Sequence, residues 1–274
     1  MTKPPWEQLP EKLFNFNPNY GGISCFVTGC MGSGKTTLLA YICLKHHREA
    51  KCICAWRGMH SGQAWLYLPD IVIWIKKPYT IAPLPTGVDT IHFYQEPELY
   101  DDVVNVIYAK PPWWRKYLAK LCKRDPDWPL SIFIDEFEDL CPSYASGRTW
   151  KDVRKLSFAV KESRKAWINI FAATQNPFDV DYRVREKFVF WVFLPGSKVP
   201  SGHIVSQEEV NKLTIGWGIV EEACSIFKKF HFPALPQLRP RRAFRMRRYG
   251  RASISSTQEL QVLSRTDADF MVHP

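Results

Sequence analysis

The feature that most constrains this chain is the sequence 29-GCMGSGKT-36, which fits the pattern G-x-x-x-x-G-K-[ST]. The pattern predicts a phosphate-binding loop where a buried strand precedes it and a helix follows. Both conditions hold, because the apolar run 23-ISCFVT-28 predicts a strand and the segment 36-TTLLAYICLKHHREA-50 predicts a helix ending in basic residues. The alternative is a glycine-rich turn with a chance Lys-Thr pair, and the two flanking elements argue against it.

This loop is expected to hold ATP and Mg²⁺. Its glycines let the backbone bend so that successive N–H groups point at phosphate oxygens, and the positive end of the following helix strengthens the attraction. Lys35 would place its ammonium between the β- and γ-phosphates, and Thr36 would ligate Mg²⁺. The residues predicted to contact the nucleotide are Gly29, Cys30, Met31, Gly32, Ser33, Gly34, Lys35, Thr36 and Thr37.

A second motif, 131-SIFIDEFEDL-140, predicts a buried strand that delivers carboxylates to the same crevice. Asp135 is expected to hold Mg²⁺, directly or through water, and Glu136 to activate or orient the water that attacks the γ-phosphate. An ordinary strand end with solvated acids is the alternative. The adjacent acid favours hydrolysis over phosphoryl transfer to a small molecule. Glu138 and Asp139 are interpreted as solvated or capping residues.

One amide and three arginines are further candidates for contact with the γ-phosphate. Gln175 comes directly after the apolar run 167-WINIFAAT-174, so it is expected beside the γ-phosphate, with a simple strand-end amide as the alternative. Arg164, Arg183 and Arg185 are candidates for an arginine finger, a guanidinium that a neighbouring subunit brings to the γ-phosphate. For each arginine, a solvated surface charge is the competing interpretation.

The rest of the chain extends this alternation into an α/β domain with a mainly parallel sheet flanked by helices. We expect an N-terminal arm over residues 1–20, the ATPase domain over 21–230 and a basic tail over 231–274. Further strands are predicted at 51–56, 71–75, 90–94, 130–136 and 188–193. Further helices are predicted at 97–110, 113–124, 148–166, 206–214 and 219–230.

Charge and composition indicate partners and compartment. Lysine and arginine number 37 against 27 acids, and the tail segment 239-RPRRAFRMRRYGR-251 is rich in arginine with no acid, which predicts a polyanion partner. A solubilising or capsid-docking tail is the alternative. No run approaches the roughly 18 to 20 apolar residues that span a bilayer. The eight cysteines include no CxxC pair, which favours reduced thiols in an intracellular compartment.

The series GCMGSGKTT, SIFIDEFEDL and ESRKAWINIFAATQNPFDVDYRVREKFVFWVF resembles the FtsK/HerA superfamily of P-loop ATPases, and most of all the viral genome-packaging ATPases. The resemblance covers roughly residues 21–195 and implies a RecA/ASCE-like P-loop NTPase fold. It places the family's motifs on Lys35 and Thr36, on Asp135 and Glu136, and on Thr174 and Gln175 with Pro177.

The resemblance also implies a homo-oligomeric ring, usually a hexamer, with ATP between subunits and DNA, expected to be double-stranded, in the channel. A capsid or portal-vertex protein would be a further partner, in the host cytoplasm or the virion. Residues 57–95 match no part of the family pattern. A zonula-occludens-toxin-like assembly ATPase and a DNA-associated ATPase switch stay open as alternatives, although the former usually carries a transmembrane helix. A small-molecule kinase is disfavoured by Glu136 and the arginine-rich tail.

Overall fold

The computed structural model describes most of the predicted domain and little outside it. The described residues are 13–14, 16–59, 68, 71–80, 88–223 and 226–232, without the side chains of 226 and 227. The arginine-rich segment 239–251 and most of the predicted arm therefore lie outside the described residues, and the boundaries of arm, domain and tail stay predictions.

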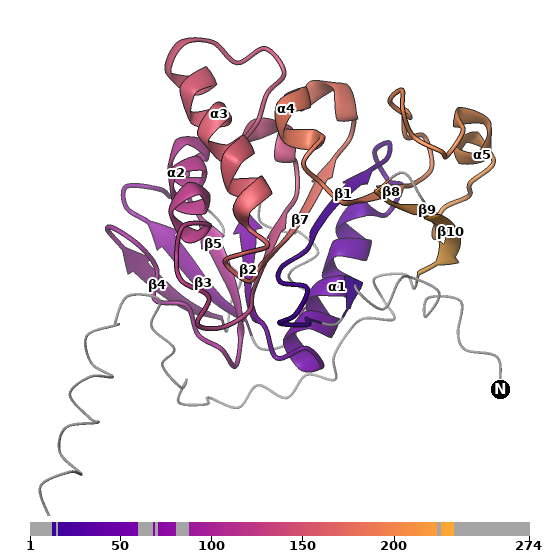
Figure 1. Ribbon diagram of the computed structural model, residues 1–274. Coiled ribbons are helices and arrows are strands. Elements are labelled where there is room, and N and C mark those ends of the chain that lie inside the picture. The colour runs from indigo at the N-terminus through magenta and orange to yellow at the C-terminus, as the bar shows by residue number, and fades with distance from the viewer. Residues whose placement is uncertain are drawn as a thin grey trace, which may run out of the picture.

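Within these residues, ten strands form one sheet in the order β10-β9-β8-β1-β7-β6-β2-β5-β3-β4 (Figure 1). Strands β1 to β8 pair in parallel, and β9 and β10 join one edge in antiparallel orientation. The strands are β1 Ser24–Thr28, β2 Ile53–Gly58, β3 Ile71–Lys76, β4 Asp89–Phe93, β5 Val104–Tyr108, β6 Leu130–Ile134, β7 Ile168–Thr174, β8 Phe190–Phe193, β9 Trp217–Glu222 and β10 Ile226–His231.

Helices cover both faces of the sheet, as Figure 1 shows. Helix α1 (Lys35–Arg48) packs its apolar side on one face, whereas α2 (Pro111–Leu121) and α3 (Gly147–Glu162) pack on the other. The central strands are buried along their whole length, as expected for a parallel sheet with helices on both sides. Two short helices, α4 (Tyr182–Arg185) and α5 (Gln207–Asn211), follow β7 and β8. The predicted α/β architecture is confirmed.

The strand order decides where the motifs meet. Strand β7 lies between β1 and β6, and it pairs with both in parallel. The carboxyl ends of all three strands therefore reach the same edge of the sheet. This is the RecA/ASCE-like arrangement that the sequence resemblance implies, with an extra strand between the one that leads into the P-loop and the one that carries the acidic motif.

The prediction of a helix over residues 97–110 is wrong, because this segment contains strand β5 (Val104–Tyr108). The amide of the fully buried Asn105 explains how a polar residue fits the strand. Its side chain donates to the carbonyls of Tyr100 and Cys54 and accepts the Tyr100 N–H. Apolar residues crowd both faces of the strand, and a run of this kind is compatible with a buried helix or a buried strand.

The prediction of a helix over residues 219–230 is also wrong. Strands β9 (Trp217–Glu222) and β10 (Ile226–His231) form an antiparallel pair there. The side chain of the acidic residue Glu221 is buried in β9. Its carboxylate accepts the backbone N–H groups of residues 204–205 and a contact from a histidine of the same loop. Tertiary contacts, absent from the local pattern, favour the strand.

A buried hydrogen-bond chain joins α1 to the amino-terminal edge of the sheet. The Nε2 of His46 lies 2.8 Å from the Leu13 carbonyl, which can only accept, so Nε2 carries the proton. Its Nδ1 therefore accepts from the Ser131 hydroxyl at 2.8 Å. Asn169 donates to the same hydroxyl oxygen and accepts the Ile23 N–H at 3.0 Å. The network fixes the entry of β1 into the sheet with a neutral imidazole.

We predict that His46 makes the fold sensitive to acid. Burial lowers the pKa of His46 to about 4, below the value of about 6.5 expected in the unfolded chain. Between these two values the unfolded chain binds a proton that the folded chain does not, so stability falls as pH drops through this window. Over the whole window the loss amounts to about 3 kcal/mol.

The test compares urea unfolding of wild type and His46→Gln at pH 7 and pH 4. The carboxylates titrate in both proteins, so only the difference between the two pH dependences reports His46. Wild type is expected to lose more stability on acidification than the variant does, and equal losses would contradict the prediction.

Candidate nucleotide-binding site

The predicted site residues meet at the carboxyl edge of the sheet. In the register of the strands, Thr28 at the end of β1 pairs with Thr174 at the end of β7. Ile134 at the end of β6 pairs with Ala172 of β7. Gly29 and Gln175 therefore leave neighbouring strands at the same level, with the acidic motif one strand further on. This convergence confirms that the three sequence motifs share one edge, where open parallel sheets bind ligands.

The P-loop has a conformation that depends on glycine. Gly32 and Gly34 have φ values of 78° and 95°, in the left-handed region that disfavours side chains. A Cβ atom on Gly29 would lie 2.5 Å from Ser33 Oγ and 2.8 Å from the Leu194 Cβ, so this position is closed to larger residues. Gly34 directly precedes α1, and the loop N–H groups and the helix terminus therefore lie together.

Lys35 is buried inside this loop. Its Nζ donates to the carbonyl oxygens of Gly29 at 2.8 Å and Cys30 at 2.9 Å. Burial lowers the pKa of Lys35, and nearby acidic groups, led by Asp135 and including Glu136, oppose that shift. The ammonium is thus held by neutral carbonyls, and its charge is available to an anion in the loop.

The two predicted Mg²⁺ ligands are in direct contact. The Thr36 hydroxyl donates to Asp135 Oδ2 at 2.5 Å, which connects α1 to the end of β6. Ser33 Oγ is buried and has no hydrogen-bond partner among the described residues, although it lies at the centre of the loop. A hydroxyl and a carboxylate side by side suit Mg²⁺, and an orphaned hydroxyl with a buried ammonium suits phosphate oxygens. The residues therefore fit Mg²⁺ and a nucleoside triphosphate.

Glu136 has a strained backbone. Its φ and ψ are 50° and 56°, a left-handed conformation that costs a non-glycine residue on the order of 1–3 kcal/mol. Its N–H donates to Asp135 Oδ1 at 3.1 Å, and a 3₁₀ turn over Phe137–Asp139 follows. Such strain persists where the surroundings hold it, and here it sets the direction in which the predicted catalytic carboxylate leaves the strand.

The interpretation of Glu138 and Asp139 as solvated or capping residues needs correction. Glu138 is half-buried, and burial raises its pKa, although the Thr174 hydroxyl and the Gln175 backbone N–H oppose the rise. Its carboxyl therefore lies close to the end of β7. Asp139 is more exposed, but its carboxylate forms an ion pair at 3.0 Å with the buried Arg57. Both acids contribute to the site's framework.

Gln175 is exposed at the end of β7, beside the P-loop strand. The chain then turns through a 3₁₀ segment, Pro177–Asp179, whose start is fixed by Asn176 accepting the Phe178 N–H. The buried Thr174 hydroxyl donates to the Asn176 carbonyl at 3.1 Å. The amide side chain thus extends from a well-anchored turn, which suits a residue that contacts a ligand at this edge.

The three candidate arginines differ in how they are held. Arg183 forms a two-pronged ion pair with the buried carboxylate of Asp181, which raises the pKa of Arg183. Arg185 donates to the Pro177 carbonyl at 2.6 Å and lies over the Phe178 ring, and it forms no ion pair with the described residues. Of these two, Arg185 has the guanidinium that is less neutralised.

Arg164 lies elsewhere. It precedes β7 and hydrogen-bonds with residues 20 and 22, which precede β1. It therefore occupies the amino-terminal edge of the sheet, opposite the P-loop of the same chain. The structure does not bring Arg164 together with the other predicted site residues.

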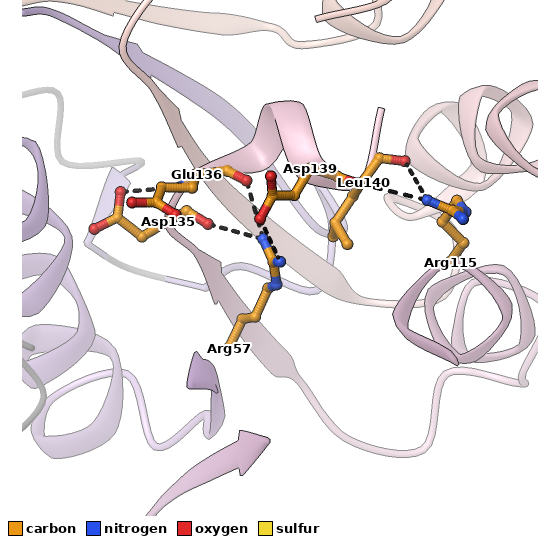
Figure 2. A network of polar contacts seen from close by, with 6 residues as sticks. All are labelled: Arg57, Arg115, Asp135, Glu136, Asp139 and Leu140. Atoms are coloured by element: carbon orange, nitrogen blue, oxygen red, sulfur yellow. Dashed lines mark hydrogen bonds and ion pairs between the residues drawn. The ribbon is translucent and has the colours of Figure 1, made fainter. Parts of the chain in front are cut away.

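Sequence reasoning missed two buried arginines behind the acidic motif. Arg57 of β2 and Arg115 of α2 both donate to backbone carbonyls of the segment 135–140 (Figure 2). A signal for Arg57 was present, because a charged residue at the end of the otherwise apolar run 51-KCICAWRG-58 requires a partner. Arg115 lies in a segment with tryptophans and lysines, where nothing in the local pattern distinguishes it from a surface charge.

The segments that follow β8 and β10 support the P-loop. The Cys30 N–H donates to the Pro195 carbonyl at 3.0 Å, and the Ser197 hydroxyl donates to that of Thr28 at 3.2 Å. The ring of Phe232, the last described residue, lies so close to Gly34 that a Cβ atom there would be 2.8 Å away. The P-loop is therefore supported by chain from the far end of the domain.

The sheet topology and the position of the P-loop together define a P-loop NTPase fold. No family model and no curated protein matches the chain. Among solved structures, it is similar to the genome packaging NTPase B204 from Sulfolobus turreted icosahedral virus 2. The complex with AMPPCP has a TM-score of 0.53 and 14% identity, covering 80% of this chain and 100% of that chain. The complex with sulfate has a TM-score of 0.53 and 13% identity, covering 80% and 98%. The predicted resemblance is thus confirmed at the level of the fold.

We predict that Lys35→Ala and Glu136→Gln separate binding from turnover. Removing the ammonium takes away a charged hydrogen bond, so affinity for ATP should fall on the order of tenfold to a hundredfold. Replacing the predicted base leaves the loop intact, so Glu136→Gln should bind ATP normally and lose on the order of a hundredfold in turnover.

Titration with a fluorescent ATP analogue measures affinity, and phosphate release measures turnover. Lys45→Ala is a matched control, because Lys45 lies on the same helix and, among the described residues, its side chain pairs only with the exposed Glu49. Normal hydrolysis by Glu136→Gln would show that another group is the base.

Proposed function

We propose that this chain is an ATP-hydrolysing DNA translocase, a genome-packaging motor that moves double-stranded DNA into a preformed capsid. The observation that carries the proposal is the convergence of Lys35, the Thr36–Asp135 pair and Glu136 at one sheet edge beside Gln175. Each group has a role in phosphoryl transfer to water, and the register of the strands brings them to the same edge of the sheet.

In this proposal each residue of the site has a separate role in ATP binding or hydrolysis. The P-loop N–H groups and Lys35 hold the phosphates and offset their charge. Thr36 and Asp135 hold Mg²⁺, which when bound neutralises the charge that develops on the phosphates. Glu136 accepts a proton from the attacking water, and Gln175 senses whether the γ-phosphate is present. The result is ATP hydrolysis.

Support for a DNA partner comes from a basic and aromatic face of α3. Cations repeat along the exposed side of this helix, and Phe158 stands among them with 59% of its surface exposed. Phosphate contacts with an interleaved aromatic are typical of nucleic-acid surfaces. The arginine-rich segment 239–251 adds to this by sequence. The exposed basic residues of α3 are Arg148, Lys151, Arg154, Lys155 and Lys161.

The structurally similar B204 is named a genome packaging NTPase, which favours genome packaging over other DNA-associated functions for this chain. A hexameric ring, a capsid or portal-vertex partner and a location in the virion or host cytoplasm belong to the same proposal. The zonula-occludens-toxin-like assembly ATPase and the DNA-associated switch are the remaining alternatives. Among the described residues, no helix is both long enough and apolar enough to cross a bilayer.

A motor should hydrolyse ATP faster on DNA and should assemble. We predict that double-stranded DNA stimulates ATP hydrolysis severalfold, and that the stimulation weakens steeply as salt rises, because phosphate contacts release counterions. The mass in solution, measured by light scattering with ATP and Mg²⁺, should be that of a ring. Displacement of a triplex-forming strand from linear duplex would separate a motor from a switch. An unstimulated monomer would contradict the proposal.

We also predict that Arg185 completes the active site of a neighbouring subunit. Arg185→Ala should bind ATP normally and lose at least about a hundredfold in hydrolysis, because an arginine finger stabilises the transition state. Arg183→Ala should lose less, since Asp181 already neutralises Arg183.

Mixing two inactive proteins tests this directly. Lys35→Ala subunits supply an intact Arg185 to the intact P-loops of Arg185→Ala subunits, so the mixture should regain hydrolysis. Arg164→Ala serves as a control at the opposite edge of the sheet. A mixture as inactive as its parts would contradict action between subunits.

A further inference from the structure

A buried arginine holds the backbone that carries the predicted catalytic base. Arg57 is the next-to-last residue of β2, and its side chain is only 3% exposed. Strand β2 pairs in parallel with β6, with Trp56 beside Phe133, so Arg57 lies next to the end of β6. Its guanidinium extends beneath the turn that contains the acidic motif, as Figure 2 shows.

The guanidinium makes three contacts with this turn. One terminal nitrogen donates to the carbonyl oxygens of Asp135 at 3.2 Å and Glu136 at 3.0 Å. The other donates to the Asp139 carboxylate at 3.0 Å. The turn is thus tied at its beginning and its end by one planar group, and the two consecutive carbonyls are drawn to the same donor.

These contacts explain why Glu136 keeps its left-handed backbone. Hydrogen bonds from a charged donor are among the stronger hydrogen bonds in proteins, and they offset the strain of a residue in this backbone region. In the orientation that the turn adopts, the carbonyl of Glu136 accepts from the Arg57 nitrogen at 3.0 Å, so this hydrogen bond stabilises the left-handed conformation. The arginine therefore fixes the direction in which the Glu136 side chain leaves the sheet.

A core-filling role does not account for this arrangement. Burying a charge is costly unless it is fully paired, and the carboxylate partner Asp139 is 44% exposed. The Arg57 Nε has no hydrogen-bond partner among the described residues. An apolar side chain of similar volume would avoid both costs. The chain keeps a buried charge at the place where it controls the backbone of the acidic motif.

Arg115 provides an internal comparison. It is also buried, its Nε also lacks a hydrogen-bond partner among the described residues, and it also donates to this segment. Its acceptors, however, are the carbonyls of Leu140 at 3.3 Å and Asp139 at 3.5 Å, beyond the catalytic positions (Figure 2). Two similar arginines therefore support one turn, and only Arg57 contacts the backbone of Asp135 and Glu136.

We propose that Arg57 is a positioning residue for ATP hydrolysis, which acts by holding the Asp135–Glu136 backbone so that the Glu136 carboxylate faces the attacking water. This inference rests on the proposed function. Because Arg57 acts through Glu136 and lies behind the acidic turn, its loss should lower turnover and leave nucleotide affinity nearly unchanged. The planar guanidinium of Arg57 is required for this role, since the ammonium of a lysine is a point charge that cannot contact both ends of the turn.

The experiment compares Arg57→Lys and Arg57→Gln with the matched variants Arg115→Lys and Arg115→Gln. For each full-length protein, thermal unfolding, affinity for a fluorescent ATP analogue and steady-state hydrolysis are measured. All four variants are expected to lose stability. The Arg57 variants should lose on the order of tenfold or more in kcat with affinity changed less than about threefold, and the Arg115 variants should keep kcat near wild type.

A double variant distinguishes positioning from general damage. If Arg57 acts through Glu136, Arg57→Lys should have no further effect on the residual turnover of Glu136→Gln, because the group it positions is already gone. An equal fold-loss in both backgrounds would overturn the proposal. So would equal kcat losses at Arg57 and Arg115.

If the Arg57 variants do not fold, Asp139→Asn provides the test. Asp139 is half-exposed, so this change removes the ion pair with Arg57 without creating a cavity in the core. A severalfold fall in kcat at unchanged affinity would support the proposal, and unchanged kcat would overturn it. Absence of ATP hydrolysis by the wild-type protein, with and without DNA, is a different result and would refute the proposed function itself.

Discussion

The hydrogen bond between the Thr36 hydroxyl and the Asp135 carboxylate is the contact on which the site depends. It joins the first turn of α1 to the end of β6, although β7 separates the two parent strands. The bond spans strands whose carboxyl ends lie at one edge of the sheet, so it depends on the register of β1, β7 and β6. The buried His46 network performs the matching task at the opposite edge, where it fixes the beginnings of the same strands.

Backbone carbonyls hold most of the cations near the site. Lys35 donates to P-loop carbonyls, Arg57 and Arg115 to those of the acidic turn, and Arg185 to that of Pro177. A carbonyl dipole orients a cation and satisfies its hydrogen bonds without cancelling its charge. A cation held in this way can still attract the phosphates of a nucleotide. Arg57 and Arg183 also have carboxylate partners, Asp139 and Asp181, and the pairing of Arg183 is two-pronged.

Short local motifs in the sequence predicted the P-loop and the acidic motif correctly. The sequence did not predict those elements and side chains whose structure depends on contacts with distant segments. The P-loop and the strand ending at Asp135 follow from short patterns with flanking context, and the structure places both as expected. Strand β5 was mistaken for a helix because its apolar run suits either element, and its pairing with β2, where Asn105 donates to the Cys54 carbonyl, is invisible in the local pattern. The same holds for Glu221 and for Arg57, because their hydrogen-bond partners belong to other segments of the chain.

The position of β1 in the sheet has a consequence for synthesis of the chain. This strand is the first in sequence, yet its two neighbours, β7 and β8, are formed by residues 168–193. A ribosome must therefore release most of the domain before the P-loop strand can acquire either partner. Until then an apolar strand and its helix are exposed, which is the situation in which nascent chains aggregate or recruit chaperones. The P-loop is synthesised early, but the strands that flank its parent strand are synthesised late. A truncated chain that ends before β7 therefore lacks a complete nucleotide-binding site.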